Sequence, residues 1–210
     1  EGYRVVNISR SPIALANAVQ LGIDIAEPDW ALRHGDAVRA AVAGSESIAL
    51  VHNAGLLTKD SVASVEAAAL HRSLQVNVVA CVQLDQLLLP AMQAGSSIVY
   101  VGSTLGEKAV AGSCAYVVSK HALIGLMRAT CQDLAGRGIH SVCVCPGFTD
   151  TEMLHAHVGH ASEVLELLAA GVTFGRLIEP EEIARTILFC AQNAVINGAV
   201  IHANLGQVER

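Results

Sequence analysis

Aromatic and charged residues are scarce in the 210-residue sequence, at 3% and 15%. This shortage of charge, combined with 52% hydrophobic residues, is the opposite of the balance that keeps chains disordered. No uninterrupted apolar run approaches the roughly 18 residues that a membrane span needs, so we expect a soluble chain without a membrane partner. Alanine, glycine and valine supply much of the apolar content, and such small residues favour close packing of helices on a sheet.

Basic residues are fewer than acidic ones, 13 against 19, and they form no cluster along the chain. A nucleic-acid partner is therefore not expected. The six cysteines match neither a disulfide framework nor a CxxC metal pair, which favours reduced thiols and a cytoplasmic location. Cys143 and Cys145 alternate along a strand-like run and so point the same way. A redox or metal role is one interpretation of this pair, but small buried hydrophobes are favoured.

Apolar strands alternate with helices along the whole chain. Strands are expected at 5–8, 19–25, 47–52, 97–101, 141–145 and 199–203. Helices are expected at 30–43, 64–92 (with a break), 116–134 and 179–192. This alternation predicts a single α/β domain over residues 1–210, a doubly wound parallel sheet between two layers of helices.

Four of the expected strands end in polar or glycine-containing motifs. These motifs are Ser9-Arg10, His52-Asn53-Ala54-Gly55, Gly102-Ser103 and Pro146-Gly147. Ligands of open parallel sheets bind beyond the carboxyl ends of the strands. The four motifs therefore predict one crevice.

Tyr116 and Lys120 lie four residues apart on an expected helix and share one face. A lysine ammonium beside a phenol stabilises the phenolate, which lets tyrosine act as a general acid or base near neutral pH. A surface tyrosine beside a solvated lysine is the alternative. Ser103 favours the catalytic interpretation, because the loop from Ser103 to Tyr116 is long enough to return the Ser103 hydroxyl to the phenol. Asn77 interrupts an apolar helical run, and a buried amide needs a specific partner.

Together these motifs resemble the short-chain dehydrogenase/reductase family, particularly its members similar to 3-oxoacyl-carrier-protein reductase. The resemblance covers residues 1 to about 206 and implies a Rossmann-like fold. It also implies a catalytic tetrad of Asn77, Ser103, Tyr116 and Lys120. Ser103 would hold the substrate oxygen, Tyr116 would pass the proton, Lys120 would hold the nicotinamide ribose, and Asn77 would position a relay water. The implied activity interconverts a carbonyl and a secondary alcohol by hydride transfer.

The resemblance also implies a nicotinamide dinucleotide site. Its expected residues are Arg10, Asp24, Ile25, Asn53, Ala54, Gly55, Tyr116, Lys120, Pro146, Gly147, Thr149 and Thr151. Arg10 lies where the family contacts the adenosine ribose, and an arginine there suits a 2′-phosphate. We therefore expect NADP(H) in preference to NAD(H), although a solvent-exposed arginine is the alternative.

One family feature, the TGxxxGxG turn with its strand, has no counterpart in this sequence. In the family's strand order that strand is central, so we expect two half-sheets with unpaired edges. We expect the chain to be a fragment; a complete chain would put cofactor binding in doubt. A non-catalytic dinucleotide-binding relative and an inactive truncated form are the alternative functions.

Two further expectations concern the lid and assembly. Residues 148–176 correspond to the family's mobile lid, and His155, His157 and His160 there lack the partners of a metal set, so no metal is expected. The helical stretches 74–92 and 116–134 are apolar nearly all round, which predicts burial on every side. We therefore expect a homodimer or homotetramer.

Overall fold

The computed structural model describes residues 2–159 and 161–208. Its strands are β1 (Val6–Ser9), β2 (Val19–Gly22), β3 (Ala49–His52), β4 (Ser97–Val101), β5 (His140–Pro146) and β6 (Val200–Ala203). Its α-helices are α1 (Trp30–Val42), α2 (Ala67–Leu74), α3 (Ala80–Leu88), α4 (Cys114–Asp133), α5 (Glu152–Val158), α6 (Ser162–Ala170) and α7 (Pro180–Gln192). A π-helical turn (Gln75–Val79) joins α2 to α3, and short 3₁₀ turns lie at Thr104–Gly106 and Ala194–Ile196.

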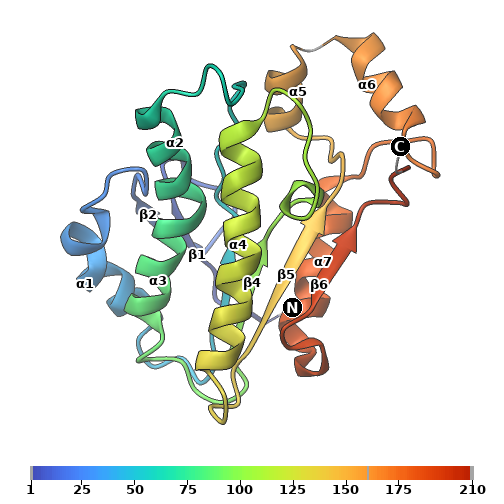
Figure 1. Ribbon diagram of the computed structural model, residues 1–210. Helices are drawn as coiled ribbons and strands as arrows, with labels where there is room; N and C mark the ends of the chain where they lie inside the picture. The colour runs from blue at the N-terminus through green and yellow to red at the C-terminus, as the bar shows by residue number, and fades with distance from the viewer. Residues whose placement is uncertain (1, 160, 209–210) are drawn as a thin grey trace.

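All strand pairs are parallel, and α4 and α7 cover opposite faces of the larger sheet (Figure 1). The alternation of side chains along β4 and β5 explains this arrangement. Ile98, Tyr100, Cys143 and Cys145 pack in the core beneath α4. Val99, Val142 and Val144 pack in a second core with Cys190 and Ala191 of α7. The predicted doubly wound α/β fold is confirmed, with Cys143 and Cys145 on one face.

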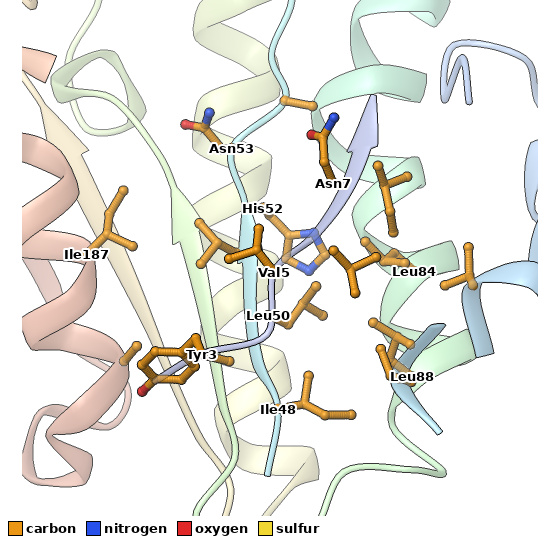
Figure 2. Close-up of a pocket in the computed structure, with 18 of the residues that line it drawn as sticks. Tyr3, Val5, Asn7, Ile48, Leu50, His52, Asn53, Leu84, Leu88 and Ile187 are labelled. Atoms are coloured by element: carbon orange, nitrogen blue, oxygen red, sulfur yellow. The ribbon is translucent and has the colours of Figure 1, made fainter. Parts of the chain in front are cut away.

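The strands form two sheets, β1-β2 and β3-β4-β5-β6. Within the described ranges, no strand pairs with the edges of β1 and β3 that face each other. Between them lies a groove of about 970 Å³. Tyr3 and Val5 line one side of it, and Ile48, Leu50 and His52 line the other (Figure 2). The expected two half-sheets with unpaired edges are therefore confirmed.

Most element boundaries follow the sequence prediction, and the differences have specific causes in the hydrogen bonding. The strand expected at 19–25 ends at Gly22, because the Asp24 carboxylate accepts the Ala26 N–H and turns the chain. The expected break in the 64–92 helix is the π-turn, which contains Asn77. The helix expected from residue 116 begins at Cys114, because Asp60 Oδ1 accepts the Ala115 N–H at 2.9 Å. The lid region contains α5 and α6.

Candidate active site

Three of the four predicted motifs meet at one edge of the larger sheet. β3, β4 and β5 are neighbours with parallel register, since His52 pairs with Tyr100 and Val101 pairs with Val144. The segments that follow these strands therefore leave the sheet at the same end. The sheet thus brings together Asn53-Ala54-Gly55, Gly102-Ser103 and Pro146-Gly147, as the sequence predicts.

Lys120 is anchored between α4 and the end of β4. Its side chain is buried, with 4% of the residue exposed, and Nζ donates a hydrogen bond to the Val101 carbonyl at 2.8 Å. The same nitrogen lies 5.5 Å from the centre of the Tyr116 ring. Because one backbone acceptor fixes the ammonium, its charge stays close to the phenol. The predicted pairing of Tyr116 with Lys120 is present.

Ser103 lies at the start of the 3₁₀ turn that follows β4. Its Oγ accepts the Leu105 N–H at 3.1 Å and so caps the turn. The turn packs against α4, the helix that carries Tyr116 and Lys120. One hydroxyl lone pair and the hydroxyl proton are left for a substrate oxygen.

Asn77 joins three segments of the site. Its Oδ1 accepts the Leu56 N–H at 2.7 Å, and its Nδ2 donates to the Leu56 carbonyl and to Ser119 Oγ at 3.0 and 2.8 Å. Ser119 in turn donates to the Tyr116 carbonyl. With 1% of the residue exposed, Asn77 fixes the loop after Gly55 against α4.

The missing side chain of Gly55 leaves a space between these groups that a Cβ atom would fill in ordinary van der Waals contact. A Cβ atom on Gly55 would lie 3.8 Å from Met153 Cε and 3.9 Å from both Asn77 Oδ1 and Lys120 Nζ. A polar cradle with a missing side chain, an amide and an ammonium suits the ribose hydroxyls of a nicotinamide nucleotide. The residues present therefore fit the nicotinamide half of the implied cofactor.

The other predicted cofactor residues fall into two groups. Thr149 donates to the Gly147 carbonyl, and Thr151 caps α5, so Pro146–Thr151 connects β5 to the lid. Arg10 is exposed after β1, and Ile25 and Asp24 follow β2. Ile25, Asn53 and Ala54 all line the groove between the two sheets. The groove thus separates the expected adenosine residues from the rest of the site.

Sequence reasoning missed several supporting residues. Asp60 caps α4 by accepting the N–H of Ala115, one residue before Tyr116, and its own backbone N–H donates to the Gly112 carbonyl. The sequence does not reveal this role, because the residues that Asp60 contacts at the start of α4 lie more than fifty positions away, although Thr58 Oγ1 also donates to Asp60 Oδ2 at 2.6 Å. Ser119 lies between Tyr116 and Lys120, but nothing in the sequence indicates its hydrogen bond to Asn77, 42 residues away.

A buried polar chain lies behind the site. His52 Nε2 contacts Asp85 Oδ1 at 2.8 Å, and Tyr100 Oη donates to Asp85 Oδ2 at 2.7 Å and contacts Thr130 Oγ1 at 2.9 Å. Burial opposes protonation of His52, but the charges and hydrogen bonds of Cys81 and Asp85 raise its pKa to about 10. In the sequence, the position of Asp85 within an apolar helical run is the one feature that could have indicated this network.

The lid histidines His155 and His157 have different surroundings. His155 Nε2 contacts Asp150 Oδ1 at 2.5 Å, while burial and the nearby charge of Lys59 lower the pKa of His157. His160 lies outside the described residues. No group of three metal-ligating side chains occurs within 2–159 and 161–208. In that part of the chain, no helix is both long enough and apolar enough to cross a bilayer.

Comparison with known proteins supports the family resemblance seen in the sequence. A sequence family described as Enoyl-(Acyl carrier protein) reductase matches residues 11–207. The chain belongs to the short-chain dehydrogenase/reductase family. This family member is 32% identical to carbonyl reductase family member 4 of Xenopus tropicalis over 72% of its length and 63% of that protein. It is 31% identical to a 3-oxoacyl-acyl-carrier-protein reductase of Thermotoga maritima, covering 76% of this chain and 65% of the relative. The chain therefore spans less than two thirds of these relatives.

Solved structures agree with the fold. A blue fluorescent protein from a metagenomic library, in complex with NADPH, matches this short-chain dehydrogenase/reductase with a TM-score of 0.78 and 30% identity, over 90% of this chain and 74% of the other. A short-chain dehydrogenase family protein from Francisella tularensis gives a TM-score of 0.86 at 23% identity, covering 96% and 86% of the two chains, which supports the fold alone.

Proposed function

We propose that this chain carries the catalytic residues of an NADP(H)-dependent oxidoreductase that interconverts a carbonyl and a secondary alcohol. The observation that carries this proposal is the position of Lys120, fixed by the Val101 carbonyl beside the Tyr116 ring. An ammonium held in this way can stabilise the negative charge that develops on Tyr116 when it gives its proton to a substrate oxygen. All four expected tetrad residues are present, which argues against a non-catalytic relative.

Each side chain has a separate task in the proposed reduction. Ser103 Oγ donates a hydrogen bond to the substrate oxygen and orients the carbonyl. Tyr116 donates its phenolic proton to that oxygen as negative charge develops there, and the Lys120 ammonium stabilises the resulting phenolate. Asn77 keeps the Leu56 loop and α4 in register. Gly55 and Lys120 would hold the nicotinamide nucleotide, which would supply the hydride when bound.

The named relatives support a substrate class for this proposal. Curated relatives include reductases of 3-oxoacyl-carrier-protein and of acetoacetyl-CoA, the latter 38% identical over 113 residues. We therefore propose a 3-oxoacyl thioester as the first substrate to test, with acetoacetyl-CoA as the probe. Cysteines at all six positions are free, which is compatible with the reducing cytoplasm as the proposed location.

The cofactor preference depends on Arg10. We expect Arg10→Ala to weaken NADPH binding by about 10-fold or more, because a charge-assisted hydrogen bond is worth about 1.5–3 kcal/mol. NADH binding should be nearly unchanged. Titration of nicotinamide fluorescence measures both affinities, and the exposed Arg33→Ala variant is the control. Equal losses for the two cofactors would make Arg10 structural, and a wild-type preference for NADH would overturn the choice.

A further inference from the structure

Apolar packing and two glutamines join the smaller sheet to the larger one. Helix α1, which follows β2, packs against α3, and side chains of the two helices share one buried core (Figure 1). Within the described ranges, the hydrogen bonds that link residues 2–46 to the rest of the chain are those donated by Gln75 and Gln83. The polar part of this connection therefore depends on two side chains.

The two glutamines form a short chain of hydrogen bonds. Gln75, the first residue of the π-turn, donates from Nε2 to the Ile25 carbonyl and to Gln83 Oε1, both at 3.1 Å. An amide nitrogen carries two protons, so both donors of Gln75 are used. Gln83 of α3 donates in turn from its Nε2 to the Pro28 carbonyl at 2.8 Å. The chain thus ends on two backbone carbonyls between β2 and α1.

The segment held in this way carries residues expected on the adenosine side of the cofactor site. Asp24 and Ile25 follow β2, and the Asp24 carboxylate accepts the Ala26 N–H at 3.0 Å, which turns the chain. Ile25 also lines the groove between the two sheets. Gln75 therefore holds the adenosine side of the expected site by its backbone.

The same π-turn also holds the nicotinamide side. Asn77, two residues after Gln75, bonds both the N–H and the carbonyl of Leu56, in the loop that follows Gly55. Gln75 and Asn77 belong to a single turn of five residues. This one turn therefore fixes the backbone at Ile25 and the backbone at Leu56 relative to each other.

We propose that Gln75 is a positioning residue that sets the separation between the adenosine and nicotinamide halves of the dinucleotide site, with Gln83 as its support. The inference rests on the proposed function, because it concerns the two halves of the proposed cofactor site. A ligand made of two linked halves binds tightly only when its two subsites are held at a separation that matches the link. Without the Gln75 hydrogen bonds, the turn at Ile25 is less well fixed. Binding of the whole ligand must then order that turn, which lowers its affinity.

Binding of NADPH to the Gln75→Met variant tests the proposal. Methionine keeps the length of the side chain and removes both donated hydrogen bonds, and the exposed Gln86→Met on α3 is the matched control. We expect titration of nicotinamide fluorescence to give about fivefold weaker binding for Gln75→Met, the effect of one net hydrogen bond. In acetoacetyl-CoA reduction the loss should appear in KM for NADPH, with kcat within about twofold of the wild type. An unchanged NADPH affinity, or an equal or larger loss in kcat, would overturn the proposal.

The Gln83→Met variant tests the supporting role of Gln83. It removes the bond to Pro28 and the acceptor for Gln75, but it leaves the bond from Gln75 to Ile25. NADPH affinity should therefore fall less than in Gln75→Met, and the double variant should lose less than the sum of the two single losses. Losses that add in full would show that the two glutamines act independently.

Hydrogen exchange of the folded chain without cofactor measures the Gln75 link separately from the proposed function. In Gln75→Met, the amides of Ala26 and Glu27 should exchange about fivefold faster than in the wild type, whereas the amides of β4 should keep their rates. Unchanged exchange at the turn, or faster exchange throughout the chain, would overturn the positioning role. A wild-type chain that binds no NADPH would contradict the proposed function alone, and the exchange rates at Ala26 and Glu27 then decide whether Gln75 fixes this turn.

Discussion

His52 and Asp85 form a buried hydrogen-bonded pair behind the site. Cys81, Asp85 and Tyr100 all face the imidazole, and the Tyr100 ring stacks on it at 4.8 Å between centres. Tyr100 and Thr130 continue the hydrogen-bonded chain to α4. Removing one partner of a buried pair leaves the other buried and unpaired. A substitution in this network should therefore lower the stability of the fold strongly.

Asp85→Asn should therefore destabilise the fold by about 3–5 kcal/mol near pH 6.5. The folded-state pKa of His52, about 10, is above its ordinary value of 6.5, so the stabilisation is complete below pH 6.5 and is lost as the pH rises through 10. The difference in unfolding free energy between the wild type and Asp85→Asn should therefore shrink as the pH rises from 6.5 to 10. Urea unfolding from pH 6 to 10 measures it.

The exposed Asp36→Asn variant, which loses an ion pair to Arg39, is the control and should change stability by less than about 1 kcal/mol. A penalty for Asp85→Asn that stays constant from pH 6.5 to 10 would show that His52 does not titrate in this window.

Among the elements, the π-turn between α2 and α3 has the most direct effect on the site. It directs Asn77 inward, where one side chain contacts the Leu56 loop and α4. The apolar periodicity of 64–92 predicts a helix with a break, but the type of turn depends on contacts 21 and 42 residues away in sequence. The strands β3, β4 and β5 were easier to predict, because each lies in a short, mostly apolar run followed by a polar residue or glycine.

Asn77→Ala should lower the free energy of unfolding by about 1–3 kcal/mol or more, because the buried Leu56 N–H and carbonyl and Ser119 Oγ lose a partner. Chemical denaturation measures the change. Asn193→Ala removes an amide that bonds an exposed helix carbonyl and should have a much smaller effect. Similar losses of stability for the two variants would contradict the role of Asn77 in fixing the Leu56 loop against α4.

At the scale of the whole molecule, two features stand out. The groove between β1 and β3 follows from the family strand order, so the sequence predicts it through the resemblance. The second feature is the outer face of α4, where Val118, Ala122, Gly125 and Ala129 are exposed at helical spacing. Val118 is 44% exposed, and Val79 of the π-turn is 42% exposed. The sequence shows that these helices are apolar all round, but a single chain leaves this stripe uncovered.

We expect the stripe to be covered in a homodimer or homotetramer. Val118→Asp would place a charge in that contact and should convert the assembly to monomers at micromolar concentration. Light scattering after size-exclusion chromatography gives the mass. Leu32→Asp, at an apolar position that is also highly exposed, is the control and should not change the mass. A wild-type monomer at this concentration would contradict the prediction.

Acetoacetyl-CoA reduction by NADPH in the wild type and in Tyr116→Phe tests the central claim most directly. The substitution removes the transferable proton and keeps the ring beside Lys120, so turnover should fall by about 100-fold or more with an unchanged unfolding midpoint. Tyr3→Phe, at the half-exposed rim of the groove, should keep the wild-type rate. Near-normal turnover in Tyr116→Phe would contradict the assignment of Tyr116 as the proton donor.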